Sequence, residues 1–161
     1  TFDLYFPITR EAAGDRRTHP PVEDFMGRGE RVLVVDDVRE QREISTRMLR
    51  RLNYEVVTAS SGEDAVVYLR EHRADVLVLD MIMDPGMDGL DTYREICRLH
   101  PGQKAVIASG FAENDRVREA QRLGAGEYVK KPYTLEGIGV ALKRALHADL
   151  EGRSEGRRQV R

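Results

Sequence analysis

Acidic residues stand directly after two of the most apolar stretches of the chain. Asp36 and Asp37 follow RVLVV, and Asp80 follows VLVL. Aliphatic runs of this kind are typical of strands buried on both faces. Carboxylates that meet beyond the ends of such strands repel one another and take up protons unless a cation neutralises them. Oxygen ligands suit a hard ion, so the sequence predicts a site for a divalent metal such as Mg²⁺.

Short aliphatic runs alternate with amphipathic segments from residue 31 to residue 150, which indicates a parallel sheet wrapped by helices, an α/β fold. The five strands that the runs predict are 31–35, 54–59, 75–79, 104–109 and 127–129. Each helix between them should bury one apolar face. In the first, third and fifth helices, the residues expected on that face are Ile44, Met48 and Leu52; Leu90, Tyr93 and Cys97; and Leu135, Ile138, Leu142 and Ala145.

Local signals mark where some of these helices begin. Ser60 or Ser61 is expected to cap the second helix, and Asp88, before Gly89, the third. The fourth helix, over residues 113–123, has the weakest apolar pattern.

Polar residues follow the other strands as well. In an open parallel sheet, ligands bind beyond the carboxyl ends of the strands, where the winding direction switches. This rule brings Ser109, after the fourth strand, and Lys131, after the fifth, to the same rim as the three acids. A metal ion and the lysine ammonium would offset the charge of a phosphoryl group there, and the serine hydroxyl could donate a hydrogen bond to it.

Five features occur in order over residues 30 to 149: VVDD, LVLDM, PGMDG, a serine after the fourth strand and Lys-Pro after the fifth. Together they resemble the receiver domain of two-component response regulators. The resemblance implies a flavodoxin-like doubly wound (βα)5 fold with strand order 2-1-3-4-5. It also implies a phosphoacceptor signalling domain that takes a phosphoryl group from a kinase histidine.

The resemblance gives each rim residue a role. Asp80 would be the phosphoacceptor, and Asp36 and Asp37 would hold Mg²⁺ together with it. Ser109 and Lys131 would bind the phosphoryl oxygens.

A switch is also implied by the resemblance. Tyr128 matches the aromatic residue that turns inward on activation. Movement of Ser109 toward the phosphoryl group would open the space for it. The change would appear on the surface formed by the fourth helix, the fifth strand and the fifth helix.

One departure from the family pattern lies after the phosphoacceptor. MIMDPGMDG places Pro85 five residues after Asp80, one more than is usual. The backbone carbonyl that family members give to the metal therefore falls on Ile82, or on Met83 if the extra residue shifts the frame. The residues that help to orient the hydrolytic water in the family fall here on Ile82 or Met83 and on Phe111, which cannot hydrogen-bond a water, so at most slow autophosphatase activity is expected.

The resemblance also implies partners, namely the phosphodonor domain of a histidine kinase and, as an option, a histidine phosphotransfer protein. Two other functions compete with this one. A pseudo-receiver would bind partners without phosphorylation. An aspartate-nucleophile phosphatase of the haloacid dehalogenase type would need a second acid two residues after the nucleophile, where this chain has Ile82.

Three segments are expected along the chain. TFDLYFPITR resembles the closing strand of the ATP-binding domain of sensor histidine kinases, which implies a hybrid kinase as the parent. The polar residues that follow contain prolines and glycines and predict a linker. The expected division is an N-terminal extension and linker over 1–29, a receiver domain over 30–150 and a flexible tail over 151–161.

Composition narrows the partners. The 26 basic and 28 acidic residues nearly cancel, to a net charge of -2, so bulk charge favours neither a nucleic-acid nor a membrane partner. A single cysteine, Cys97, allows no intrachain disulfide and no thiolate zinc site, and it is expected in the core. A cytoplasmic location is expected, with a parent that is free to be membrane-anchored.

Overall fold

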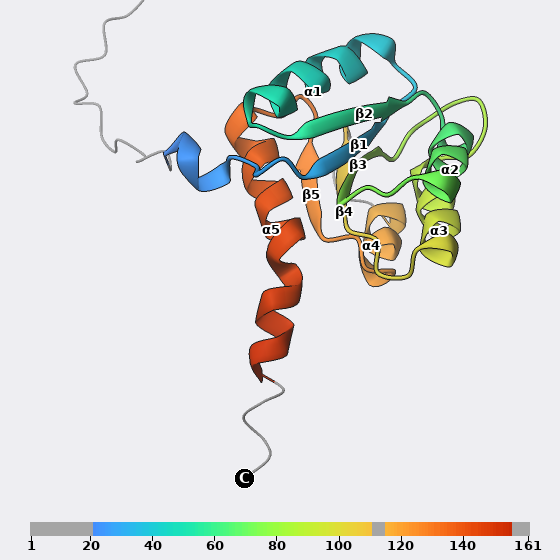
Figure 1. Cartoon of the computed structure of the whole chain (residues 1–161). Helices are drawn as coiled ribbons and strands as arrows, with labels where there is room; N and C mark the ends of the chain where they lie inside the picture. Colours follow the sequence, from blue (N-terminus) through green and yellow to red (C-terminus); the bar gives the residue numbers. More distant parts are fainter. Residues whose placement is uncertain (1–20, 111–114, 156–161) are drawn as a thin grey trace, which may run out of the picture.

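A parallel sheet forms the centre of the molecule, which was analysed as a computed structural model that describes residues 21–110 and 115–155, with side chains to residue 148 (Figure 1). Its strands lie in the order β2-β1-β3-β4-β5, which confirms the predicted flavodoxin-like α/β fold. Each observed strand begins and ends within one residue of its predicted bounds. The strands are β1 (Arg31–Val35), β2 (Glu55–Ala59), β3 (Val76–Asp80), β4 (Ala105–Ser109) and β5 (Glu127–Lys130).

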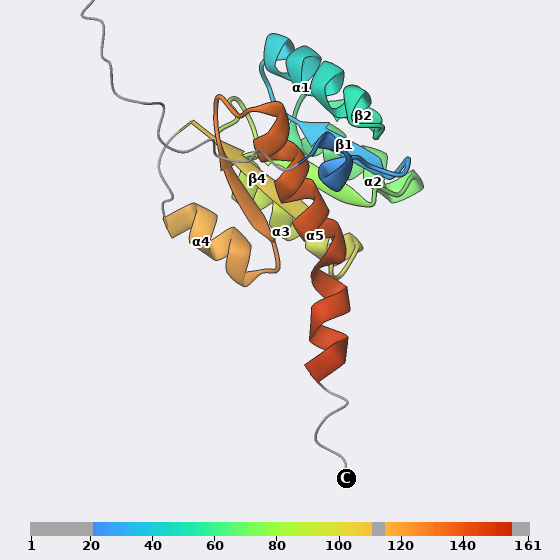
Figure 2. The ribbon, with the colours of Figure 1, turned by 90° about the vertical axis from the view of Figure 1, so that its left-hand side faces the viewer.

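Helices cover both faces of the sheet, with α1 and α5 on one face and α2, α3 and α4 on the other (Figures 1 and 2). They are α1 (Arg39–Arg51), α2 (Gly62–Glu71), α3 (Gly89–Leu99), α4 (Asp115–Arg122) and α5 (Leu135–Glu155). Successive residues of a strand point to opposite faces. Val32 and Val34 accordingly pack with α1 and α5, whereas Leu33 and Val35 pack with α2 and α3. The two cores leave the carboxyl ends of the strands as one rigid rim.

The predicted helix faces are correct for α3 and α5, and for α1 they are correct for Leu52 and Met48 but not for Ile44. Tyr93, Ile138 and Leu142 are fully buried, and Cys97 is partly buried against the same core as Tyr93. In α1, however, Ile44 is 51% exposed, while Ser45 is 2% exposed. Ser45 tolerates this position because its hydroxyl donates to the Gln41 carbonyl at 2.8 Å and lies 2.6 Å from the Tyr133 hydroxyl. A satisfied polar group thus holds the place that apolar periodicity assigned to Ile44.

The expected helix starts are confirmed. The Ser61 hydroxyl accepts from the Asp64 amide at 3.1 Å, and an Asp88 carboxylate oxygen accepts from the Asp91 amide at 3.0 Å. Both side chains satisfy amides that have no partner within their helices.

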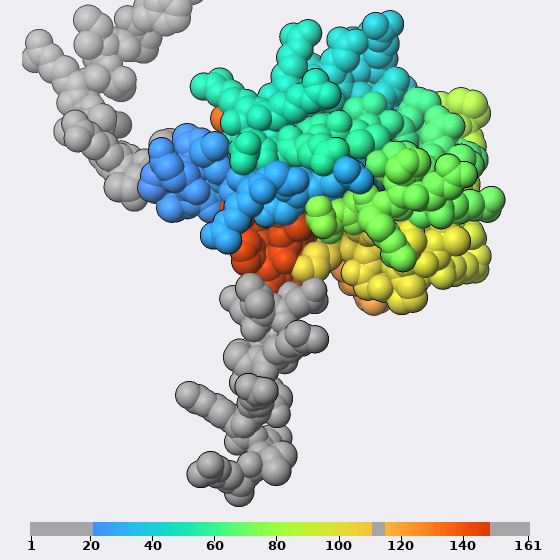
Figure 3. Space-filling model, viewed as in Figure 1, coloured from blue at the N-terminus to red at the C-terminus, as the bar shows by residue number. Residues whose placement is uncertain are grey.

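The segment before β1 packs on the domain, contrary to the predicted linker. Phe25, in the short 3-10 helix η1 (Val22–Phe25), is 3% exposed and belongs to the core beneath α1 and α5. The Gly27 amide donates to the Leu52 carbonyl at 2.7 Å. In Figure 3 this blue segment lies against α5 and the chain around β2. The chain around Phe25 and Gly27 therefore packs against the folded unit.

The other expected segments are only partly covered. Residues 1–20, which include TFDLYFPITR, lie outside the described part of the chain. At the other end, α5 extends to Glu155, beyond the predicted start of the tail at residue 151.

Candidate functional site

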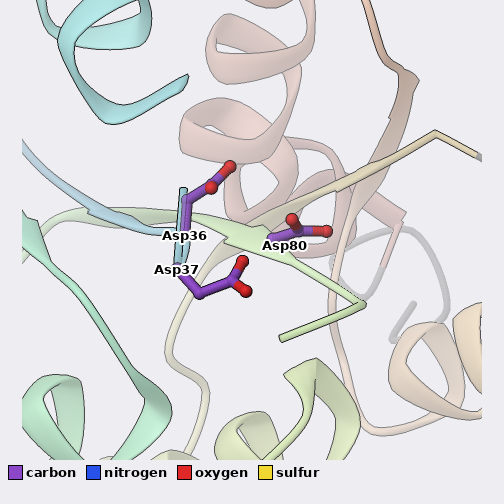
Figure 4. A group of neighbouring side chains, drawn as sticks. All are labelled: Asp36, Asp37 and Asp80. Atoms are coloured by element: carbon purple, nitrogen blue, oxygen red, sulfur yellow. The ribbon is translucent and has the colours of Figure 1, made fainter. Parts of the chain in front are cut away.

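Three carboxylates meet at the carboxyl end of the sheet (Figure 4). Asp80 is the last residue of β3, and Asp36 and Asp37 follow β1. One oxygen from each lies within 4.8 Å of the others. Asp36 and Asp80 are 3% and 8% exposed, and Asp37 lies nearer the surface. The acids that the sequence placed at one rim do converge there.

Lys131 bridges two of these acids. Its ammonium nitrogen lies 2.5 Å from Asp36 Oδ2 and 2.7 Å from Asp80 Oδ2. The backbone fixes the lysine as well, because its amide donates to the Ser109 carbonyl at 2.7 Å. The Lys131–Pro132 peptide bond is cis. One ammonium among three carboxylates leaves an excess of two formal negative charges at this rim.

Backbone amides orient the carboxylates. Asp36 Oδ1 accepts from the Val38 amide at 2.9 Å, and Asp80 Oδ1 accepts from the Ile82 amide at 3.1 Å. Each carboxylate oxygen has a further lone pair, so these bonds leave room for another ligand. Carboxylate oxygens with excess negative charge are the ligands that Mg²⁺ takes in proteins, so the residues present fit this ion.

Burial and pairing act in opposite directions on the ionisable groups of the rim. Burial raises the pKa of Asp80 above its ordinary value, although hydrogen bonds from Lys131 and the Ile82 amide oppose the rise. For Lys131, burial lowers the pKa, but the hydrogen bonds to Asp36 and Asp80 outweigh it and leave the pKa raised. The ammonium therefore stays charged at neutral pH.

Ser109 is the last residue of β4, and Tyr128 lies in the neighbouring strand β5. Ser109 is 1% exposed. It lies next to the end of β3, because the Met81 amide donates to the carbonyl of the preceding residue, Ala108, at 3.3 Å. Tyr128 is partly buried and packs against the core shared with α2, α3 and α4. Phe111 lies outside the described residues.

The two candidates for the metal-binding carbonyl differ in their surroundings. The Ile82 side chain is 50% exposed, whereas that of Met83 is 5% exposed. The segment that carries both carbonyls is tied to the acids at each end. The Ile82 amide donates to Asp80 Oδ1 at 3.1 Å, and the Asp84 amide donates to Asp37 Oδ2 at 3.4 Å.

Arg42 takes part in the site although the sequence analysis did not single it out. Its Nη1 donates to the carbonyls of Asp36 and Asp37, at 2.6 Å and 2.9 Å. The guanidinium thus fixes the turn that carries both acids. The only signal in the sequence is an arginine five residues after Asp37, one turn into α1, which is too common a pattern to be informative.

A family model for the response regulator receiver domain matches residues 32–143. The chain belongs to this family. Chemotaxis protein CheY of Thermotoga maritima is 32% identical over 117 residues, which make up 72% of this chain and 97% of that protein. Sporulation initiation phosphotransferase F of Bacillus subtilis is 28% identical over 73% of this chain and 94% of its own length.

Solved structures agree with this assignment. Chemotaxis protein CheY4 of Vibrio cholerae has a TM-score of 0.68 at 26% identity and covers 73% of this chain and 99% of its own. A receiver domain protein of Clostridium thermocellum has a TM-score of 0.69 at 29% identity, over 76% of this chain and 98% of its own. The receiver is thus homologous to the phosphoacceptor domains of two-component systems, and neither the phosphatase nor the pseudo-receiver is favoured.

Membrane contact through a spanning helix finds no support in residues 21–110 and 115–155, where every helix is too short or too polar to cross a bilayer.

Proposed function

We propose that Asp80 of this receiver accepts a phosphoryl group from a phosphohistidine of a histidine kinase, with Mg²⁺ held by Asp36, Asp37 and Asp80. The observation that carries this proposal is the Lys131 bridge between Asp36 and Asp80 within a cluster that retains excess negative charge. A carboxylate at the end of a rigid strand is a nucleophile at a fixed position. The bridge places a cation beside that nucleophile.

The transfer balances as a displacement at phosphorus. A carboxylate oxygen of Asp80 forms the new O–P bond as the N–P bond of the phosphohistidine breaks. The electron pair of the N–P bond stays on the imidazole, which keeps the proton on its other nitrogen and leaves neutral. The acyl phosphate carries about two negative charges at neutral pH.

The residues around Asp80 stabilise that charge. Lys131 can keep its bond to Asp36 while its ammonium meets a phosphoryl oxygen, and the Ser109 hydroxyl can donate a second hydrogen bond. Mg²⁺, when bound, supplies positive charge beside the transferring phosphoryl oxygens. Its ligands would be the three carboxylates and the backbone carbonyl of Ile82 or Met83.

The signal would leave through Ser109 and Tyr128. Movement of the Ser109 hydroxyl toward the phosphoryl group gives Tyr128, now partly buried, space to pack further inward. The surface of α4, β5 and α5 changes as a result, and partners would recognise that change. The same proposal includes a cytoplasmic location for this receiver and a hybrid kinase as its parent, which is free to be membrane-anchored. A histidine phosphotransfer protein as a further acceptor also belongs to it.

Phosphoryl uptake tests this function directly. The protein is incubated with acetyl phosphate and Mg²⁺ and its intact mass is measured. Wild type should gain one phosphoryl group, and Asp80→Asn none, because the amide is nearly isosteric and lacks the nucleophilic oxygen. Asp115→Asn is the matched control, since that side chain is 98% exposed on α4.

Two outcomes would contradict the proposal. Equal uptake by Asp80→Asn would place the acceptor elsewhere. A wild type that stays unmodified by both acetyl phosphate and a phosphorylated kinase domain would indicate a pseudo-receiver.

A further inference from the structure

The loop between β3 and α3, residues 81–88, contains the extra residue that the sequence shows before Pro85. Its base is closed tightly. The Gly89 amide donates to the Met81 carbonyl at 3.3 Å. A Cβ on Gly89 would lie 2.3 Å from the Asp80 carbonyl oxygen, so the glycine lets α3 begin directly against the end of β3. The residues between Met81 and Gly89 therefore project from a fixed base.

The rest of the loop is held from two sides. The Asp84 amide donates to Asp37 Oδ2 at 3.4 Å, which ties the loop to the acids after β1. The Met87 amide donates to Glu63 Oε1 at 2.9 Å, which ties it to the first turn of α2. The first contact is long and weak and the second is of ordinary length, so the Glu63 contact is the stronger of the two.

Gly86 makes the approach of Glu63 feasible. It adopts φ +112°, a region that L side chains rarely enter, and a Cβ there would lie 2.7 Å from Glu63 Oε1. The glycine thus leaves room for the Glu63 carboxylate to accept from the Met87 amide.

The Glu63 carboxylate is suited to this contact. Hydrogen bonds from its own backbone amide and from the Met87 amide hold its pKa below the ordinary value. It is therefore ionised at neutral pH, and a hydrogen bond from an amide to a carboxylate is stronger than one between neutral groups. Asp64, its neighbour, is engaged differently, since it accepts from the Ser60 hydroxyl at 2.5 Å.

We propose that Glu63 is a positioning residue for the phosphorylation site, which fixes the 81–88 loop and with it the backbone carbonyl of Ile82 or Met83. This inference rests on the proposed function, since it assigns the carbonyl to Mg²⁺. Glu63 does not belong to the cluster of Asp36, Asp37 and Asp80 to which the metal is assigned. Groups that orient metal ligands from outside the ligand set can change affinity strongly when they are removed.

Magnesium titration of the whole chain is the first measurement. Glu63→Ala removes the acceptor, and its Mg²⁺ dissociation constant should rise about tenfold, as for other groups that orient ligands. Glu71→Ala is the matched control, because it removes the same charge from the other end of α2. Glu63→Gln keeps an oxygen acceptor and should stay within about twofold of wild type.

Phosphoryl uptake gives a second, separable readout. The Mg²⁺ concentration for half-maximal uptake from acetyl phosphate should rise by the same factor in Glu63→Ala. At saturating Mg²⁺ the rate should return to within about twofold of wild type, the pattern of a lost binding contribution rather than lost chemistry. If Glu63 had a purely structural role, Glu63→Ala would lower stability without raising the Mg²⁺ concentration for half-maximal uptake.

A second variant tests the same contact from the loop. Gly86→Ala leaves Glu63 in place but puts a Cβ against its carboxylate, so it should raise the Mg²⁺ dissociation constant in the same way. Faster hydrogen exchange of the Met87 amide in metal-free Glu63→Ala and Gly86→Ala is expected as well.

Equal Mg²⁺ affinity in Glu63→Ala and Glu71→Ala would overturn the positioning role, whatever the uptake experiment shows. A wild type that binds Mg²⁺ but takes up no phosphoryl group would overturn the proposed function, while the titration and the Met87 exchange would still decide the role of Glu63. A wild type that binds no Mg²⁺ would overturn both.

Discussion

Lys131 sets the charge balance of the acidic cluster. Its ammonium is largely buried, with 15% of the side chain exposed, between carboxylates that are 5% and 10% exposed. Removal of one partner from a buried ionic group leaves the other charges without compensation and is strongly destabilising. The lysine therefore contributes to the fold of the apo protein as well as to the proposed chemistry.

Lys131→Met should lower the free energy of unfolding by about 3 kcal/mol at pH 7 without Mg²⁺, because Asp36 and Asp80 would then repel each other unpaired. Urea unfolding in the presence of a chelator measures this. The exposed neighbour supplies the control variant Lys130→Met, which should change the value by less than about 0.5 kcal/mol.

The loss of unfolding free energy in Lys131→Met should be smaller at acidic pH. The folded-state pKa of Asp80 is already raised by burial, and protonation of this carboxyl as the pH falls removes the repulsion. A loss that stays constant from pH 7 to pH 4 would contradict this account of the site.

Asp37 is the least buried acid of the cluster and should decide the Mg²⁺ response. In wild type, Mg²⁺ at ten times its dissociation constant should stabilise the fold by about 1.4 kcal/mol. For a chain of this size that is a rise in Tm of about 3–5 °C. Asp37→Ala should lose the rise, and Asp115→Ala should keep it. Thermal unfolding with and without Mg²⁺ measures both, and an undiminished rise in Asp37→Ala would relocate the metal site.

Among individual residues, the sequence predicted those whose position is set by the carboxyl end of a strand. Asp36, Asp37 and Asp80 follow or end aliphatic runs, and Lys131 follows β5. Parallel strands bring such positions to one edge. Glu63 and Arg42 are different, because their contacts are with backbone groups of segments whose course only the folded chain defines. An exposed glutamate or arginine on a helix carries no local sign of such a partner.

Elements were predictable to the extent that apolar periodicity decides them. The strands follow their aliphatic runs closely, since strands buried on both faces consist of little else. Only Ile44 was wrongly predicted on the buried face of α1, because Ser45 is buried there through two hydrogen bonds and a hydrophobic pattern does not register a satisfied hydroxyl. The strand order came from the resemblance rather than from the pattern of the strands.

Asp88 couples two elements. As the N-cap of α3 it accepts from the Asp91 amide, and it also pairs with Arg116 of α4. A second ion pair joins the same helices, between Arg94 and Glu119 at 3.7 Å. Burial raises the pKa of Asp88, but Arg116 and the capped amides outweigh it, so the pKa is lowered overall. The α3 N-terminus and α4 are thus linked through one ionised side chain.

Asp88→Ala should lower the free energy of unfolding by about 1–2 kcal/mol at pH 7, through loss of the cap and the ion pair. Asp88→Asn, which keeps a capping oxygen, should cost less. A lowered folded pKa gives stability that is present above the unfolded value, about 4, and is lost as the pH falls through the folded value. The difference in free energy of unfolding between wild type and Asp88→Ala, measured with urea, should therefore decrease from pH 7 to pH 3. A constant difference would show that the ionised form of Asp88 contributes nothing to stability.

Residues before β1 pack on the domain, although the sequence predicted residues 1–29 as an extension and linker. Among residues 22–29, Phe25 and Gly27 are buried and Met26 is partly buried, while the other residues are exposed. A Cβ at Gly139 of α5 would lie 2.5 Å from the Phe25 ring, so α5 has a glycine where the ring packs. A single aromatic residue gives no periodicity, and the glycine against which its ring packs lies more than a hundred residues later, in α5. The boundary of the receiver was therefore not predictable from local pattern.

The folded unit should accordingly depend on this segment. Phe25→Ala should lower the free energy of unfolding by about 3 kcal/mol, the usual cost of emptying a buried phenylalanine site. Val22→Ala is the matched control, since Val22 lies in the same 3-10 helix but is 46% exposed, and it should change little. A chain that starts at residue 30 should be less stable than one that starts at residue 21 by at least the Phe25→Ala loss, because the bond from the Gly27 amide to the Leu52 carbonyl also disappears.

Phosphoryl uptake by the shortened chain separates stability from function. The segment enters β1 at Arg31, whereas the acids follow the other end of that strand, after Val35. The chain that starts at residue 30 should therefore take up phosphoryl groups at the same rate as the chain that starts at residue 21. The comparison is made at a temperature, or with an osmolyte, at which both chains are fully folded. Urea midpoints that coincide for the chains starting at residues 21 and 30 would show that the segment lies on the domain without stabilising it, and the boundary would return to residue 30.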